Sequence, residues 1–203
     1  MKPITLEINE IRAIIFDLDN TLVSCELNFS QLRQQLGCPQ EIDLLCFVEA
    51  MTDKQAQRHA EQTILDHELS DAKHAQPLPG CHALLHYLKQ QQIKSAIVTR
   101  NCLQASQLKL EQTQIDIEHL ITREHCAPKP DPEALIQLAT QWRLEPHQIL
   151  YVGDYLYDLE AAYNADMPSC LVTNGEDKGF ASLASITVTR LDELQEKLQQ
   201  RDV

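Results

Sequence analysis

The chain has 203 residues and a formal charge of −13, from 30 acidic and 17 basic side chains, which disfavours nucleic acid and anionic membranes as partners. An apolar content of 43% argues against a fibrous or disordered protein and suffices for one substantial core, with or without a small second domain. Residues 1–10 lack a secretory signal, no apolar run approaches the roughly 18 residues that span a bilayer, and the seven dispersed cysteines include no Cys-x-x-Cys pair. We therefore expect a cytoplasmic protein without a disulfide framework or a thiolate zinc site.

The first predicted strand is the short apolar run Ala13–Phe16. After it the apolar spacing changes to three, four and seven residues, which predicts two to four short helices over Cys25–Gln76. The sequence Pro77-Leu78-Pro79-Gly80 then ends this segment. About fifty residues are too few for a strong core, so we expect the insert to pack over the end of the first strand. The expected division is a main domain, residues 1–23 and 78–203, and a small α-helical insert, residues 24–77.

Helical and strand patterns alternate from Cys81 onward. Helices are predicted at Ala83–Gln91, Leu103–Gln112, Pro132–Gln141, Leu156–Asn164 and Leu191–Gln200. Strands are predicted at Ile93–Thr99, Leu120–Ile121, Gln148–Val152, Ser169–Thr173 and, more weakly, Ile186–Val188. Asp131 is expected to cap the helix that Pro132 begins. Strands that alternate with single helices predict an α/β fold, a doubly wound parallel sheet covered on both faces.

Two carboxylates and a hydroxyl follow the first strand directly. Asp17, Asp19 and Thr21 would lie at the carboxyl end of a buried strand, where open α/β sheets bind ligands. One carboxylate could then act as a nucleophile or metal ligand and the other as a proton donor, provided that a cation offsets their repulsion. A polar turn capped by Asp and Thr is the alternative interpretation.

Polar groups also follow later strands. Thr99, Arg100 and Asn101 combine a hydroxyl with free backbone N–H groups at a helix start, which is a ready anion site. Lys129 lies between two prolines, and a stiff loop with one ammonium suits phosphate binding. The alternatives are an ordinary helix cap at Thr99 or Asn101 and a rigid connector whose lysine faces water.

A further acidic pair follows the strand that ends near Val152. Asp154 and Asp158 are spaced i, i+4 and should share a helix face, and such carboxylates suit Mg²⁺. Gly153 is expected to allow a sharp turn before them. A helix that opens with two acids and binds no ligand is the alternative.

These motifs, in this order and at these strand ends, resemble those of the haloacid dehalogenase-like (HAD) hydrolase superfamily, whose first motif is Asp-x-Asp-x-Thr. The resemblance covers most of Ile11–Gly175 and implies a HAD-like core with a small helical cap inserted after the first strand. Many relatives have glycine at the position of Asp166, and aspartate can adopt the left-handed backbone at some cost.

The resemblance implies a role for each residue. Asp17 would attack phosphorus to give an aspartyl-phosphate, and Asp19 would protonate the leaving oxygen and then activate water. The groups expected to hold the phosphoryl oxygens are Thr99, Arg100, Asn101 and Lys129. The groups expected to bind Mg²⁺ are the Asp17 carboxylate, the Asp19 backbone carbonyl, Asp154 and Asp158.

The insert is similar to the cap of a short-capped, phosphoglycolate phosphatase-like subgroup. Arg33 would be its substrate contact, although a surface arginine is an alternative. The substrate would be a small phosphorylated metabolite, such as phosphoglycolate or a sugar phosphate, and the protein a monomer or homodimer. Two other hypotheses are a β-phosphoglucomutase-like phosphotransferase, which needs several cap cations, and a non-catalytic binding protein on the same fold. The cap offers few cations, namely Arg33, Lys54, Arg58 and Lys73.

Overall fold

The structure is a computed structural model that describes residues 1–200. Within these residues a six-stranded sheet has the order β3-β2-β1-β4-β5-β6, and all neighbouring strands run parallel. The central strand β1 pairs with β2 on one side and β4 on the other. The strands are β1 (Ala13–Phe16), β2 (Lys94–Val98), β3 (His119–Ile121), β4 (Ile149–Gly153), β5 (Ser169–Val172) and β6 (Ile186–Val188).

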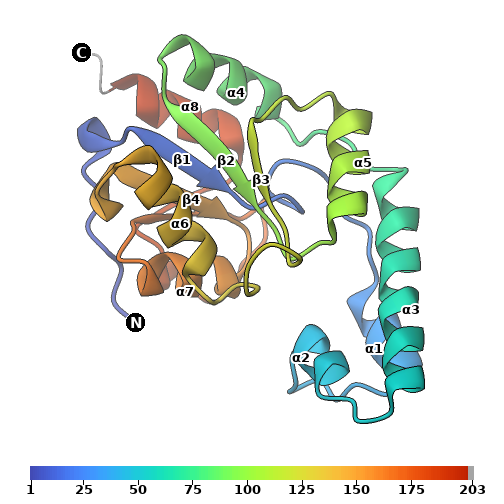
Figure 1. Cartoon of the computed structure of the whole chain (residues 1–203). Helices are drawn as coiled ribbons and strands as arrows, with labels where there is room; N and C mark the ends of the chain where they lie inside the picture. Colours follow the sequence, from blue (N-terminus) through green and yellow to red (C-terminus); the bar gives the residue numbers. More distant parts are fainter. Residues whose placement is uncertain (201–203) are drawn as a thin grey trace.

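Different helices cover the two faces of the sheet, because successive strand residues point to opposite sides. Ile14 and Phe16 of β1 belong to a buried cluster with side chains of α4 (Cys81–Gln90) and α8 (Leu191–Gln199). Ala13 and Ile15 belong to a second cluster with α6 (Glu133–Trp142) and α7 (Leu156–Asn164). Figure 1 shows these helices on either side of the strands. The predicted parallel α/β sheet with two covered faces is therefore confirmed.

The segment between β1 and α4 forms the helices α1 (Phe29–Leu36), α2 (Leu44–Glu49) and α3 (Lys54–Ala72), which lie to one side of the sheet (Figure 1). They share a small apolar cluster that includes Leu32, Leu44 and Ile64. Near its end α3 also packs against α5 (Leu103–Thr113) through the cluster around Ala72, Cys102 and Ala105. The insert therefore has its own small core and an apolar contact with α5 of the main body of the protein.

Some predicted bounds and one predicted length were wrong. The insert was expected to contain short helices, but α3 is 19 residues long. It contains no glycine or proline that would end it, and Asp53 caps its first turn. α6 begins at Glu133 and not at Pro132, although the Asp131 carboxylate still accepts the Glu133 N–H at 2.9 Å. The other helices and strands agree with the predictions to within about two residues, as expected at frayed ends.

Three short 3₁₀ helices complete the described secondary structure: Ile8–Glu10, Pro146–Gln148 and Ala181–Leu183. Asp166 has φ of 55°, the left-handed conformation expected where relatives have glycine. Every helix within residues 1–200 is too short or too polar to cross a lipid bilayer.

Candidate active site

The ends of three adjacent strands bring the predicted site residues together. Asp17 follows β1, Thr99 follows β2 and Asp154 follows β4, and these strands are neighbours in the sheet. The Asp17 N–H donates to the Val152 carbonyl at 2.8 Å, which continues the pairing of β1 with β4 beyond the strand. One cavity of about 410 Å³ is lined by Asp17, Asp19, Thr99, Arg100, Asn101, Lys129, Asp154 and Asp158.

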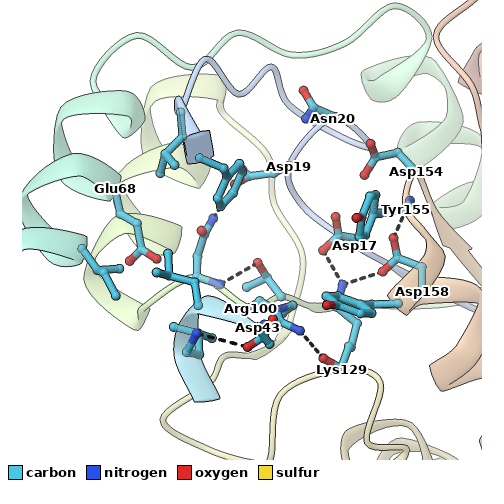
Figure 2. A pocket seen from close by; sticks show the side chains of 18 of the residues that line it. Asp17, Asp19, Asn20, Asp43, Glu68, Arg100, Lys129, Asp154, Tyr155 and Asp158 are labelled. Carbon is cyan, nitrogen blue, oxygen red and sulfur yellow. Dashed lines mark hydrogen bonds and ion pairs between the residues drawn. The ribbon is translucent and has the colours of Figure 1, made fainter. Parts of the chain in front are cut away.

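Lys129 lies at the centre of a buried cluster of carboxylates, shown in Figure 2. Its Nζ is 2.5 Å from Asp17 Oδ1, 2.7 Å from Asp158 Oδ1 and 2.9 Å from the Tyr151 hydroxyl. The side chains of Lys129 and Asp158 are only 4% and 3% exposed. Burial alone would lower the pKa of the Lys129 ammonium, but Asp158 and Asp17 outweigh this effect and raise it. Lys129 is therefore a fixed positive charge beside the Asp17 carboxylate.

The space that Asp158 occupies depends on Gly153. A Cβ atom at position 153 would lie 2.3 Å from Cγ of Asp158, so any side chain there would displace the carboxylate. Gly153 is the last residue of β4 and does not have a positive φ. The glycine is therefore needed for the close approach of a side chain, and its predicted part in the backbone turn stays a prediction.

Asp17, Asp154 and Asp158 could together hold a cation. Their ligand oxygens lie within 4.8 Å of one another and all three residues are buried. Carboxylates in this number and spacing suit a divalent cation that prefers oxygen ligands. Burial raises the pKa of Asp17 to about 8, and repulsion from Asp158 and Asp154 adds to the rise against the lowering effect of Lys129. Burial and Asp158 likewise raise the pKa of Asp154 to about 6, although Lys178, 3.4 Å from its Oδ2, lowers it.

Asp19 points away from this cluster and has its own partners. Its Oδ1 is 2.5 Å from Lys109 Nζ, and its Oδ2 accepts the Asn101 side-chain amide at 2.9 Å. Lys109 lies on α5, is 1% exposed, and is also 2.6 Å from Asp71 Oδ2 near the end of α3. The Asp71 Oδ1 atom in turn accepts the Glu26 N–H at 2.7 Å. Lys109 thus connects Asp19 to both chain segments that join the insert to the main domain.

The side chains of the segment after β2 point in different directions. Thr99 is buried and its Oγ1 accepts the Asn101 N–H at 3.2 Å. The Asn101 side chain is turned toward Asp19. Arg100 instead reaches the insert, where its Nη2 lies 2.5 Å from Asp43 Oδ2 at the start of α2. Its guanidinium also donates to the Lys129 carbonyl and stacks 4.6 Å from the Tyr157 ring centre. Its predicted role in phosphate binding stays a prediction.

Arg33 of the insert lines the same cavity as the carboxylates. Its Nη1 donates to the carbonyls of Pro39 at 2.9 Å and Ile42 at 2.6 Å, which holds the loop between α1 and α2. Its predicted contact with substrate is not tested by this geometry.

Two buried residues of the site escaped the sequence analysis. Lys109 shares the buried stripe of α5 with Ala105, Ser106 and Thr113, and a lysine at such spacing was the available signal. Tyr151 is fully buried in β4, and its hydroxyl contacts Lys129 and Asp158. A tyrosine within an otherwise aliphatic buried strand was the corresponding signal, because a buried hydroxyl needs a partner.

The amino-acid sequence of this chain is similar to those of known hydrolases. The family model described as "Haloacid dehalogenase-like hydrolase" matches residues 14–172. A haloacid dehalogenase-like hydrolase domain-containing protein of Arabidopsis thaliana is 28% identical over 159 residues, or 73% of this chain and 64% of that protein. This chain therefore spans less than two thirds of that relative.

A second relative and a solved structure cover nearly the whole chain. An uncharacterized hydrolase of Saccharomyces cerevisiae is 25% identical over 202 residues, or 95% of this chain and 93% of the relative. The crystal structure of a predicted phosphoglycolate phosphatase from Haemophilus somnus has a TM-score of 0.72 at 22% identity, and covers 93% of this chain and 98% of its own. The structural likeness concerns the fold.

Proposed function

Because the chain belongs to the haloacid dehalogenase-like hydrolases, we propose that it is a phosphatase that hydrolyses monoesters of small phosphorylated metabolites with the help of Mg²⁺. One observation carries this proposal: Asp17, Asp19, Lys129 and Asp154, which are far apart in the sequence, line a single cavity. A cavity of about 410 Å³ is within the usual size of small-molecule sites.

The proposed reaction has two steps. A carboxylate oxygen of Asp17 attacks phosphorus, the bond from phosphorus to the ester oxygen breaks, and Asp19 gives a proton to the departing alcohol. Water then attacks the phosphorus of the aspartyl-phosphate while Asp19 takes its proton, which releases inorganic phosphate and restores Asp17. Asn101 and Lys109 hold the Asp19 carboxylate through both of its oxygens, which fixes its position at the wall of the cavity.

We assign the phosphoryl oxygens to Lys129, the Thr99 hydroxyl and nearby backbone N–H groups. Lys129 already contacts Asp17 at 2.5 Å, so a phosphoryl group that approaches Asp17 also approaches the ammonium. The residues that would hold Mg²⁺ are Asp17, Asp154 and Asp158, with the Asp19 backbone carbonyl. The ion would stabilise the negative charge of the phosphoryl group and keep Asp17 ionised.

We propose that residues 24–77 act as a cap that closes the cavity over the substrate. Side chains of α1, α2 and α3 line the cavity together with the strand ends, so the insert is in position to exclude water and contact the alcohol part of the ester. The cytoplasmic location and the monomeric or homodimeric state stay predictions.

The cations of the insert favour hydrolysis over the phosphotransferase hypothesis. A phosphotransferase of the β-phosphoglucomutase type would need several positive charges around a second phosphate. Of the cap cations Arg33, Lys54, Arg58 and Lys73, only Arg33 lines the cavity within the described residues. Hydrolysis of a monophosphate needs no second phosphate site.

The proposal is tested by phosphate release from a panel of phosphate monoesters with Mg²⁺. The wild-type protein should turn over at least one ester, a chelator should abolish turnover, and Asp17→Asn should reduce kcat by at least about 10³-fold. Asp166→Asn is the matched control, because it removes one carboxylate at an exposed left-handed position that asparagine also adopts. Equal turnover by wild type and a folded Asp17→Asn protein would contradict the proposal.

A further inference from the structure

Most of the side chains that the insert contributes to the cavity are apolar. They come from all three insert helices and the segment before them: Leu27, Phe29, Leu32, Leu44, Leu45 and Ile64. Phe29 of α1 is 55% exposed, and Tyr155 at the start of α7, which also lines the cavity, is 53% exposed. Two aromatic side chains that line the cavity, one from the insert and one from α7, therefore remain in contact with water, and an apolar ligand would cover them.

The charged side chains on the insert side of the cavity are largely neutralised by one another. Arg100 is paired with Asp43 at 2.5 Å. Glu68 is paired with Arg123, whose Nη1 and Nη2 donate to its two oxygens at 2.5 and 3.0 Å. Each of these four charges has an opposite partner, so neither pair is available to an anionic ligand without loss of a salt bridge.

Arg33 is the remaining lining cation on the insert side within residues 1–200. Its Nη1 donates to the carbonyls of Pro39 and Ile42, which fixes the guanidinium against the loop and commits part of its donors to the protein. The third lining cation, Lys129, lies between Asp17 and Asp158 of the main domain. A carboxylate or second phosphate placed among the insert side chains would thus have a single partly committed guanidinium as its cationic partner and would otherwise lie next to leucine and isoleucine.

We infer that the alcohol part of the substrate is uncharged and apolar or aromatic, so that the enzyme prefers monophosphate esters of neutral alcohols to phosphocarboxylates and bisphosphates. This inference rests on the proposed phosphatase function and adds the substrate class to it. Only the phosphoryl group of such an ester would meet the carboxylates and Lys129, while its organic part would lie against the apolar wall of the insert.

The experiment compares benzyl phosphate with 4-carboxybenzyl phosphate, which has a nearly identical leaving alcohol and differs in one distant negative charge. We expect kcat/KM for benzyl phosphate to exceed that for the carboxylated ester and for phosphoglycolate by at least about tenfold each. Equal or better turnover of either acidic ester would overturn the inference while leaving the phosphatase intact. If no ester of the panel, these esters and p-nitrophenyl phosphate included, is hydrolysed with Mg²⁺, the proposed function fails and the inference fails with it.

Substitutions in the apolar wall of the insert test where the alcohol part of the substrate binds. Leu45→Lys places a cation on a half-buried position of α2, and we expect it to shift the ratio of the two benzyl esters toward the carboxylated one by at least about tenfold. Phe29→Ala, at an exposed position that folding does not require, should raise KM for benzyl phosphate about fivefold with little change in kcat. Ile136→Lys adds the same charge to an exposed position of α6 outside the cavity lining and should leave the ratio unchanged. An unchanged ratio in Leu45→Lys would place the alcohol elsewhere and overturn the inference.

Discussion

Two buried lysines, each between carboxylates, lie close to the end of β1. We assign Lys129 to catalysis and Lys109 to the attachment of the insert to the main domain. The Lys129 cluster consists of Lys129, its partners Asp17 and Asp158, and Asp154, whose carboxylate lies beside theirs. In the Lys109 cluster, Asp19 and Asp71 bind Lys109, with the Cys25 thiol nearby. Asp17 and Asp19 are two residues apart in the sequence, and in an extended strand they would point to the same side. They belong to different clusters because β1 ends at Phe16 and the chain bends before Asp19.

The two clusters differ in charge. The Lys129 cluster has three carboxylates around one ammonium, and Asp154 has only a longer contact with Lys178 at 3.4 Å. The Lys109 cluster has two carboxylates, each within 2.6 Å of the ammonium. Burial and then Asp19 raise the pKa of the Cys25 thiol, so cysteine adds no charge to it. The Lys129 cluster, with three carboxylates to one ammonium, therefore has a larger excess of negative charge than the Lys109 cluster, with two carboxylates to one ammonium, and a divalent cation can offset that excess.

The clusters also differ in what they connect. Lys129, Asp17 and Asp158 all come from the main domain, and they line the cavity. Lys109 comes from α5 and Asp71 from the end of α3, and Lys109 is not among the cavity-lining residues. We therefore expect loss of Lys129 to affect chemistry most, and loss of Lys109 to affect stability and the placement of Asp19.

The largest expected effect is that of Lys129→Met, which keeps most of the side-chain volume and removes the charge. We expect kcat/KM to fall by at least about 10³-fold, because the phosphoryl group loses its main positive contact. Phosphate release measures this loss. Lys197→Met, at an exposed position of α8, is the matched control and should retain full activity. A Lys129→Met protein within about tenfold of wild type would show that the cluster is only structural.

The second prediction concerns Lys109→Met. Breaking a buried ion pair should destabilise the protein by about 3 kcal/mol, measured by urea unfolding. We expect kcat/KM to fall only about 10- to 100-fold for alkyl phosphates, because Asp19 loses its fixed orientation while Asp17 keeps Lys129.

Two esters with different leaving groups distinguish a role of Lys109 in orienting Asp19 from a general loss of stability. p-Nitrophenolate leaves without a proton, so p-nitrophenyl phosphate depends less on Asp19 than an alkyl phosphate does. The Lys109→Met loss should therefore be several-fold smaller for the nitrophenyl ester, and Lys109→Arg should recover part of it. Equal losses with both esters would assign Lys109 to folding alone.

The difference between the Lys129 cluster and the Lys109 cluster explains which site residues could be predicted from the sequence. Asp17, Thr99, Lys129 and Asp154 each follow a strand or stand in a stiff loop, and the ends of parallel strands meet at one edge of a sheet. Their convergence follows from the order of elements along the chain. The Lys109 cluster joins two helices, α3 and α5, whose contact depends on tertiary packing that no local pattern encodes. The directions of the side chains could not be predicted from the sequence either. Arg100 follows Thr99 directly, yet its side chain points to the insert.

The third prediction uses the raised pKa values of the Lys129 cluster. Without metal, Asp17 has its pKa raised to about 8 and Asp154 to about 6. The folded protein then binds more protons than the unfolded chain between about pH 4 and pH 8, so this contribution to stability is full at low pH and is lost as pH rises. The chelated protein should therefore have a lower Tm at about pH 8 than at about pH 5.5, and Mg²⁺ should raise Tm more at the higher pH.

Asp17→Asn separates the effect of Asp17 ionisation on Tm from the effect of the net charge of the protein. The amide cannot ionise, so the chelated variant should lose much of the pH dependence and gain Tm at about pH 8, where each kcal/mol corresponds to roughly 2–4 °C for a chain of this length. Calorimetric scans with and without Mg²⁺ measure both quantities. A pH dependence identical to that of wild type would mean that Asp17 does not change its ionisation on folding.

The smallest expected effect concerns a link between the Lys129 loop and the insert. Arg100 donates to the Lys129 carbonyl and pairs with Asp43, which also caps α2 through the N–H groups of Leu45 and Cys46. Burial would raise the pKa of Asp43, but Arg100 and the Cys46 N–H outweigh this effect and lower it, as expected for an ionised partner. Asp43→Asn keeps a capping oxygen and removes the charge, so it tests the ion pair separately from the helix cap.

The Asp43 and Arg100 side chains are 20% and 22% exposed, so their pair should contribute only about 0.5–1 kcal/mol. We expect Asp43→Asn to raise KM about two- to fivefold at nearly constant kcat, because the insert closes less firmly while the Lys129 cluster is untouched. Asp53→Asn is the matched control, since Asp53 caps α3 in the same way. If both variants raise KM equally, the charge of the helix N-cap residue matters and the ion pair with Arg100 does not. A fall in kcat with Asp43→Asn alone would instead mean that the Lys129 cluster depends on the insert as strongly as the Lys109 cluster does.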